Sequence, residues 1–302
     1  MREDFAANLV SGLLEARTGQ QLTRDRHWRI ETALAGLMRE QGIENADQLA
    51  RRLLQPGQEA LAEAVVEALL NNETYFFRDR PLFDQLSQKI LPALAARRGD
   101  TRRLAIWSAG CSTGQEALSL AMIFAEQRMR WAGWTIEIVA TDVSRSAIAS
   151  ARKGAYSQFQ VQRGLGVQQM LTCFEEAREG WRVDPALHRA VRFEVHNVLD
   201  PAPRPGRFDL VLCRNVLLYF DSTTRGRALD RIGDALADDG FLMLGGGESP
   251  AAHSNRFVTC RANTNFFQHA PSRAATAPGK DSIPIRPSLS ANSLKSNLST
   301  FR

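Results

Sequence analysis

The chain has 302 residues, of which 44% are hydrophobic and 24% are charged, as is usual for a soluble globular protein. This length suits one large domain together with a smaller one. No apolar run approaches the ~20 residues that a membrane span needs. Residues 1–19 lack the basic start and long apolar centre of a signal peptide. We therefore expect a cytoplasmic protein.

The net charge of +5 does not predict nucleic acid binding, because of where the charge lies. Residues 271–302 contain five basic residues and one acidic residue, whereas a nucleic-acid module concentrates its charge on a folded face. The cysteines form no Cys-x-x-Cys pair, so we expect reduced thiols and neither a metal site nor a disulfide framework. They are Cys111, Cys173, Cys213 and Cys260.

The first 70 residues predict a small all-helical domain. Apolar residues recur there at spacings of three and four, and glycines mark the breaks. Basic residues gather at positions 24–29, which indicates either a solvated helix face or a docking surface. Residues 71–100 predict a linker, with two phenylalanines beside Arg78, followed by a connecting helix from Pro81 to Arg98.

Residues 103–122 predict a strand, a tight loop and a helix. The apolar run Leu104–Trp107 leads into a loop with Gly110 and Gly114, and apolar residues at helical spacing follow. In an open parallel sheet, such a first turn places a nucleotide-like ligand between the end of the strand and the start of the helix.

The next strand, residues 134–142, ends at an acidic residue. A carboxylate at this place can accept hydrogen bonds from ribose hydroxyls, because it is purely an acceptor. Asp142 could instead be the N-cap of a helix over residues 145–153, a role that Ser144 could also fill.

The alternation of strands and helices up to residue 250 predicts an α/β fold with a doubly wound sheet. Residues 154–190 have a weaker pattern and indicate an inserted subdomain. Residues beyond 270, rich in Pro, Ser and Asn, predict a disordered tail. Further strands are expected at 191–196, 208–213 and 241–244. A helix capped by Asp221 or Ser222 is expected to run through Ala237, with Asp239-Gly240 as the signal that ends it. Residues 256–258 and 265–268 are expected to form a closing hairpin.

The glycine loop restricts the ligand. It lacks the Gly-x-Gly-x-x-Gly spacing of dinucleotide sites and the Gly-Lys-Ser/Thr of triphosphate sites. A nucleoside-like ligand without phosphates remains, and S-adenosylmethionine fits that description.

Five motifs together resemble the chemotaxis receptor glutamate methyltransferases (CheR type), in the same order and over about residues 1–270. They are residues 72–78, 107–116, 140–142, 197–198 and 213–221. The resemblance implies a Rossmann-like methyltransferase sheet with a helical domain (1–70), a linker and connecting helix (71–100), and an S-adenosylmethionine-binding domain (101–270). It further implies a small inserted β subdomain at about 154–190, with the tail at 271–302.

The resemblance also implies the reaction and the partners. Such enzymes form methyl esters on glutamates of chemoreceptor cytoplasmic helices, so we expect a monomeric enzyme in chemotaxis signalling that inserts into no membrane. The alternative is a cofactor-binding interaction or sensory protein of the same fold without methyl transfer. A third hypothesis is a small-molecule methyltransferase with a closed pocket.

Site residues follow from the resemblance position by position. Asn72, Thr74 and Arg78 are expected at the methionine end of the cofactor, although Arg78 could instead form an interdomain ion pair. Tyr219 and one of Arg97 or Arg98 are expected to orient the incoming carboxylate, although Tyr219 could be a core aromatic. The other expected cofactor-binding residues are Gly110, Glu116, Asp142, Asn197, Val198, Arg214 and Asn215.

Overall fold

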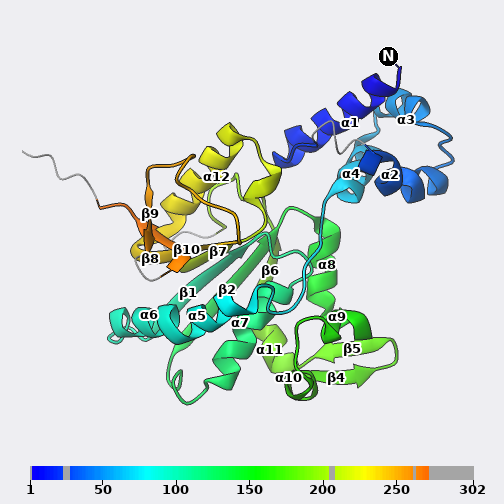
Figure 1. Cartoon of the computed structure of the whole chain (residues 1–302). Helices are drawn as coiled ribbons and strands as arrows, with labels where there is room; N and C mark the ends of the chain where they lie inside the picture. Colours follow the sequence, from blue (N-terminus) through cyan, green and yellow to red (C-terminus); the bar gives the residue numbers. More distant parts are fainter. Residues whose placement is uncertain (1, 23–27, 204–207, 261–262, 272–302) are drawn as a thin grey trace, which may run out of the picture. The chain divides into compact units, whose positions relative to one another are not determined.

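The computed structural model describes residues 2–22, 28–203, 208–260 and 263–271, and contacts join the chain up to Ala270 into one compact unit (Figure 1). The predicted disordered tail, apart from Pro271, and most of the basic cluster at 24–29 lie outside the described residues. Within the described part of the chain, no helix is both long enough and apolar enough to cross a membrane.

The described residues before the linker are helical, as the spacing of apolar residues predicts. Their apolar faces form a hydrophobic cluster of their own, with Leu14, Leu34 and Val65 almost fully buried. We refer to these helices as the helical part. They are α1 (Arg2–Thr18), α2 (Trp28–Glu40), α3 (Ala46–Leu53) and α4 (Glu59–Leu69).

A seven-stranded sheet of order β6-β2-β1-β7-β8-β10-β9 forms the centre of the remaining chain. The pairs from β6 to β8 are parallel, and β10 is antiparallel to β8 and β9, which confirms the doubly wound fold and the closing hairpin. The strands are β1 (Arg103–Ala109), β2 (Thr135–Asp142), β6 (Val191–Val195), β7 (Phe208–Cys213), β8 (Leu236–Leu244), β9 (Phe257–Cys260) and β10 (Asn263–His269).

Helices cover both faces of this sheet (Figure 1). Successive strand residues alternate between the two layers, so Ile106 packs in one hydrophobic cluster and Trp107 in the other. One layer holds α5 (Arg80–Gln85), a π-helical turn (Leu86–Ile90), α6 (Leu91–Arg97), α7 (Gln115–Glu126) and α8 (Arg145–Lys153), and the other holds α12 (Ser222–Ala235).

The boundary between α12 and β8 differs from the sequence prediction. The helix ends at Ala235, and β8 begins at Leu236, so Asp239-Gly240 lies within a strand and does not end the helix. Leu236 is fully buried and pairs with Phe208 of the neighbouring strand. Strand pairing and burial therefore override the local turn signal.

The inserted segment is a small β subdomain, as predicted. Its antiparallel sheet has the order β3-β5-β4, and the ring of Phe76 from the linker packs edge-on against Tyr156 and Phe174, with centroids 5.2 and 5.4 Å away. The subdomain comprises β3 (Ala155–Tyr156), α9 (Gln158–Gln162), α10 (Val167–Cys173), β4 (Phe174–Ala177), β5 (Gly180–Val183) and α11 (Pro185–Arg189).

Arg98, just after α6, ties the connecting helix to the starts of the strands. Its guanidinium contacts Asp209 of β7 at 2.6 Å and Asp239 of β8 at 2.5 Å. Asp209 also accepts a hydrogen bond from the backbone N–H of Ala105 in β1, at 2.8 Å. The carboxylate of Asp209 is largely buried, so these partners replace the water that would otherwise stabilise its charge.

We predict that Arg98→Ala lowers the free energy of unfolding by about 2 kcal/mol, because Asp209 is left as a poorly solvated charge. Arg103→Ala, which removes an exposed arginine at the start of β1, should change it by less than about 0.5 kcal/mol. Urea denaturation of both variants measures the difference, and equal stabilities would contradict the structural role of Arg98.

Candidate functional site

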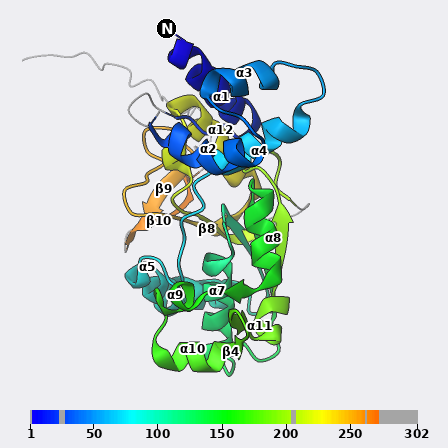
Figure 2. The same ribbon diagram turned by 90° about the vertical axis from the view of Figure 1, so that its right-hand side faces the viewer.

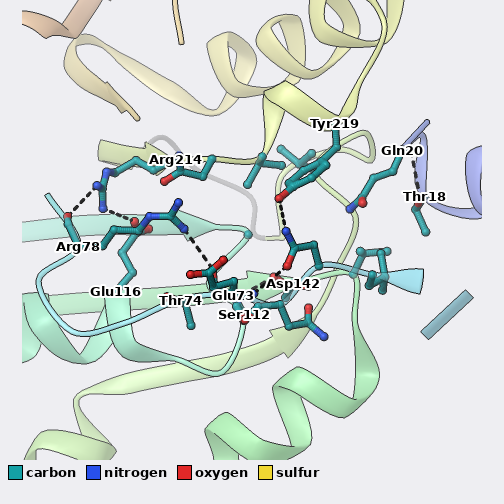
Figure 3. Close-up of a pocket in the computed structure, with 18 of the residues that line it drawn as sticks. Thr18, Gln20, Glu73, Thr74, Arg78, Ser112, Glu116, Asp142, Arg214 and Tyr219 are labelled. Atoms are coloured by element: carbon teal, nitrogen blue, oxygen red, sulfur yellow. Dashed lines mark hydrogen bonds and ion pairs between the residues drawn. The ribbon is translucent and has the colours of Figure 1, made fainter. Parts of the chain in front are cut away.

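A pocket of about 1020 Å³, part of it open to solvent, lies at the carboxyl ends of β1, β2, β6 and β7 (Figure 3). This is where ligands bind in open α/β sheets. All of the predicted cofactor-binding residues line the pocket, and so does Tyr219. The lining also includes residues from the helical part and the linker, among them Thr18, Gln20, Asn71, Glu73 and Tyr75.

The glycine loop after β1 needs its first glycine. Gly110 has a φ of 81°, and a Cβ placed there would lie 2.2 Å from Cγ2 of Val216. The backbone N–H groups of Gly110 and Cys111 both donate to the carbonyl of Thr141, at 2.7 and 2.9 Å. The loop is thereby fixed to the end of β2, where Asp142 lies.

Asp142 is buried at the pocket wall with both carboxylate oxygens engaged. It accepts the backbone N–H of Ser112 at 2.8 Å and that of Ser144 at 2.9 Å. Ser144 is the N-cap of α8, since its side chain accepts from the N–H of Ala147, so the N-cap alternative for Asp142 is wrong. Burial raises the pKa of Asp142, and the N–H groups from Ser144 and Ser112 oppose that rise.

Arg214, directly after β7, is a buried cation with two carboxylate partners. It contacts Glu116 at 3.0 Å and Asp79 at 2.7 Å, and it donates to the carbonyl of Arg78 at 2.7 Å. The second oxygen of Glu116 accepts from the hydroxyl of Ser108 at 2.8 Å. The positive charge of Arg214 is therefore compensated inside the protein.

Arg78 differs from Arg214 in its partners. It is half-buried at the pocket, and its guanidinium donates to the carbonyl of Glu73 at 3.1 Å and lies 5.7 Å from the ring centroid of Tyr75. Within the described part of the chain it forms no ion pair with a carboxylate, so the interdomain ion pair is absent there. An arginine in this state can bind an anionic group of a ligand.

The inserted subdomain holds the linker beside Arg78. Arg163 forms an ion pair with Glu73 at 2.9 Å and lies over the Tyr75 ring at 4.3 Å. The hydrogen bond and charge of Arg163 hold the pKa of Glu73 below its usual value. A Cβ on Gly164 would lie 1.8 Å from the carbonyl oxygen of Phe76, so only glycine allows this close approach.

Besides Nε of Arg214, two buried polar atoms of residues that line the pocket have no hydrogen-bond partner among the described residues. They are Oδ1 of Asn215 and Nδ1 of His196. Asn215 has a φ of 59°, and its backbone N–H donates to Glu248 at 2.7 Å. Because buried polar groups are normally paired, these two are candidates for contacts with a ligand.

Asn197 and Val198 follow β6. The Oδ1 of Asn197 accepts from the N–H of Leu199 at 3.0 Å, and its Nδ2 donates to the carbonyl of Arg17 in α1 at 3.4 Å. Val198 is buried and offers an apolar surface. The pocket lining thus combines apolar side chains with several polar groups, which suits an amphipathic ligand.

Tyr219 lies at the pocket and not in the core. Its side chain is half-buried, and its hydroxyl oxygen accepts from Nδ2 of Asn71 in the linker at 2.7 Å (Figure 3). Because the oxygen accepts this bond, the hydroxyl hydrogen can still be donated to a ligand. The alternative of a core aromatic is therefore wrong.

The structure does not bring Arg97 and Arg98 to this pocket. Both contact Asp239 near the start of β8, whereas the pocket lies where the parallel strands end. The prediction that one of them orients a substrate carboxylate is wrong, because these side chains lie where β7 and β8 begin, at the end of the sheet opposite the pocket.

Sequence reasoning missed several residues that line the pocket. Ser112 and His196 follow from the rule that residues just after β1 and β6 meet at one edge of the sheet. Thr18 and Gln20 carry no comparable signal, since the end of α1 reaches the pocket only through tertiary packing.

The fold and the pocket define an α/β protein that binds a nucleoside-like ligand at the end of its parallel strands. The family model described as CheR methyltransferase, SAM binding domain, matches residues 72–266. The chain belongs to this family of methyltransferases, and its cofactor is S-adenosylmethionine.

Curated relatives cover most of the chain. A chemotaxis protein methyltransferase 1 of Pseudomonas aeruginosa is 38% identical over 240 residues, covering 78% of this chain and 87% of the relative. A chemotaxis protein methyltransferase of Vibrio parahaemolyticus is 33% identical over 260 residues, covering 85% and 94%. A Pseudomonas putida protein, chemotaxis protein methyltransferase Cher2, is 35% identical over 240 residues, covering 78% and 87%.

The raised pKa of Asp142 predicts how cofactor binding depends on pH. Protonation removes acceptors for ribose hydroxyls, so affinity falls as the pH decreases, and the fall begins above the range where an exposed aspartate titrates, about pH 3.9. Calorimetry with S-adenosylhomocysteine, the demethylated product, measures this effect. Asp142→Asn should bind weakly and lose this pH dependence, and the same pH dependence in both proteins would contradict the assignment.

Proposed function

We propose that this protein transfers the methyl group of S-adenosylmethionine to glutamate carboxylates on cytoplasmic helices of chemoreceptors, forming methyl esters. The observation that carries the proposal is Arg78, a half-buried guanidinium at the pocket that forms no ion pair within the described part of the chain. It lies beside Arg214, whose charge two carboxylates compensate. The names of the relatives, chemotaxis protein methyltransferases, support the receptor substrate.

The pocket residues fit the groups of the cofactor. Arg78 suits the methionine carboxylate, and the unpaired Oδ1 of Asn215 suits the ammonium group. Asp142 suits the ribose hydroxyls, and the apolar surface of Val198 suits adenine. We assign Asn72, Thr74 and Asn197 to the same site, because they line the same pocket.

The paired state of Arg214 matters for the charge of the site. S-adenosylmethionine supplies a methyl group carried by a positively charged sulfur. An uncompensated buried arginine beside that charge would repel it, but Glu116 and Asp79 neutralise Arg214. Glu116 therefore acts mainly by holding Arg214, together with Ser108.

The reaction requires no general base from the chain. A glutamate with an ordinary pKa of about 4.3 is ionised at neutral pH and is already a nucleophile. The work of the protein is to align the two reactants and to exclude water from their contact. Tyr219 can donate its free hydroxyl hydrogen to the incoming carboxylate and so orient it.

We further propose that the helical part, the linker and the α/β part divide near residues 70 and 100, and that the protein acts in the cytoplasm as a monomer. The separate hydrophobic cluster of α1–α4 supports the first boundary. A receptor helix that presents several glutamates has to be reached in the cytoplasm, which supports the location.

Labelled S-adenosylmethionine and receptor-containing membranes test the proposed reaction. The expected product is receptor-bound label released by mild base, as methyl esters are. Arg78→Ala should weaken the binding of S-adenosylhomocysteine at least about tenfold, through loss of a charge-assisted contact. Arg128→Ala, at an exposed site outside the pocket, is the matched control and should change nothing. Product binding without base-labile label would favour the non-catalytic alternative.

Tyr219→Phe separates orientation of the substrate from binding of the cofactor. We expect kcat to fall about tenfold through the loss of one hydrogen bond in the reacting complex, with the affinity for S-adenosylhomocysteine within about twofold of wild type. Asn71→Ala removes the hydrogen bond that Asn71 donates to the Tyr219 hydroxyl, and it should lower kcat by a smaller factor. An unchanged kcat in Tyr219→Phe would remove the proposed role.

A further inference from the structure

Glu67 of α4 binds the start of α8 through its carboxylate. One oxygen accepts the backbone N–H of Arg145 at 2.6 Å. The other accepts the hydroxyls of Ser144 at 2.8 Å and Ser146 at 2.7 Å, with the N–H of Ser146 at 3.4 Å. Both views show α4 close to the same end of α8 (Figures 1 and 2).

This contact is suited to a carboxylate. The first N–H groups of a helix have no partner within the helix, and they carry partial positive charge that an anion stabilises. Glu67 is half-buried, which strengthens these charge-assisted hydrogen bonds relative to an exposed pair. It thus supplements the cap that Ser144 provides from within α8.

A continuous set of hydrogen bonds connects Glu67 to the cofactor pocket. Ser144, which donates to Glu67, also donates its backbone N–H to Asp142 and accepts from Nδ2 of Asn72 at 3.3 Å. Ser112 completes the set, since its N–H donates to Asp142 and its hydroxyl donates to the carbonyl of Asn72 at 2.7 Å. The acid at the ribose end and the linker are therefore fixed by the same contacts.

The helical part is also attached on the other side of the pocket. The N–H of Gln21 donates to the carbonyl of Tyr219 at 2.8 Å, and its side chain donates to Asp221 at 3.2 Å. Thr18 and Gln20, just before Gln21 in the chain, line the pocket. The position of the helical part thus sets the shape of the pocket itself.

We propose that Glu67 is a positioning residue for the cofactor, which makes cofactor binding depend on the attachment of the helical part to α8. This inference rests on the proposed function, because it takes the pocket to be the S-adenosylmethionine site. Glu67 is not among the residues that line the pocket. It acts through Ser144 on Asp142 and Asn72.

Calorimetry with S-adenosylhomocysteine tests the proposal, at a temperature where circular dichroism shows every variant folded. Glu67→Ala should weaken binding about tenfold, and Glu67→Gln, which keeps an acceptor, should restore part of the loss. The matched control is Glu63→Ala, one turn earlier on α4 and exposed, which should bind like wild type. A purely structural role for Glu67 would lower the melting temperature but leave the affinity of the folded protein unchanged.

A double-mutant cycle with Ser146, which is exposed and lies outside the pocket, tests the route of the effect. Ser146→Ala should weaken binding in the wild-type background and have no further effect in Glu67→Ala, because both changes remove the same contact. Wild-type affinity in folded Glu67→Ala would overturn the inference. Failure of the wild-type protein itself to bind S-adenosylhomocysteine would instead overturn the proposed function.

Discussion

The candidate site depends on the buried guanidinium of Arg214. It lies directly after β7 and joins the end of that strand to two other segments. They are the start of α7, through Glu116, and the linker just before α5, through the carboxylate of Asp79 and the carbonyl of Arg78. A buried cation is stable only when it is paired and hydrogen-bonded, so the protein keeps these three segments together. The guanidinium of Arg78 forms no ion pair with a carboxylate among the described residues, and Arg78 lines the pocket.

Two other parts of the chain hold the linker from outside. The inserted subdomain contacts it through Arg163, which meets both Glu73 and the Tyr75 ring, and through the close approach of Gly164 to Phe76. The helical part acts through Glu67, which binds the start of α8, where Ser144 accepts a hydrogen bond from Asn72 of the linker. A linker of polar and aromatic residues thereby becomes a fixed wall of a pocket, although it forms no regular structure of its own.

Sequence reasoning succeeded where the information is local. The sheet, the glycine loop and the acid that ends β2 follow from apolar alternation, from glycine spacing and from the rule for the carboxyl ends of parallel strands. It failed for the start of β8, where Leu236 is in a strand despite the turn signal after it. It also failed for Arg97 and Arg98, because the direction of a side chain from α6 depends on how that helix packs.

The sequence by itself determined the fold class, the family and a set of residues that meet in one pocket, because motifs in register restrict each position independently of its distant neighbours. The tertiary structure decided the partners of those residues. Only packing shows that two carboxylates compensate Arg214, whereas Arg78 has no ion pair among the described residues. Only packing shows, too, that Tyr219 accepts a bond from Asn71, that Thr18 and Gln20 line the pocket, and that Glu67 contacts the start of α8. These contacts join segments far apart in the chain, so no local pattern encodes them.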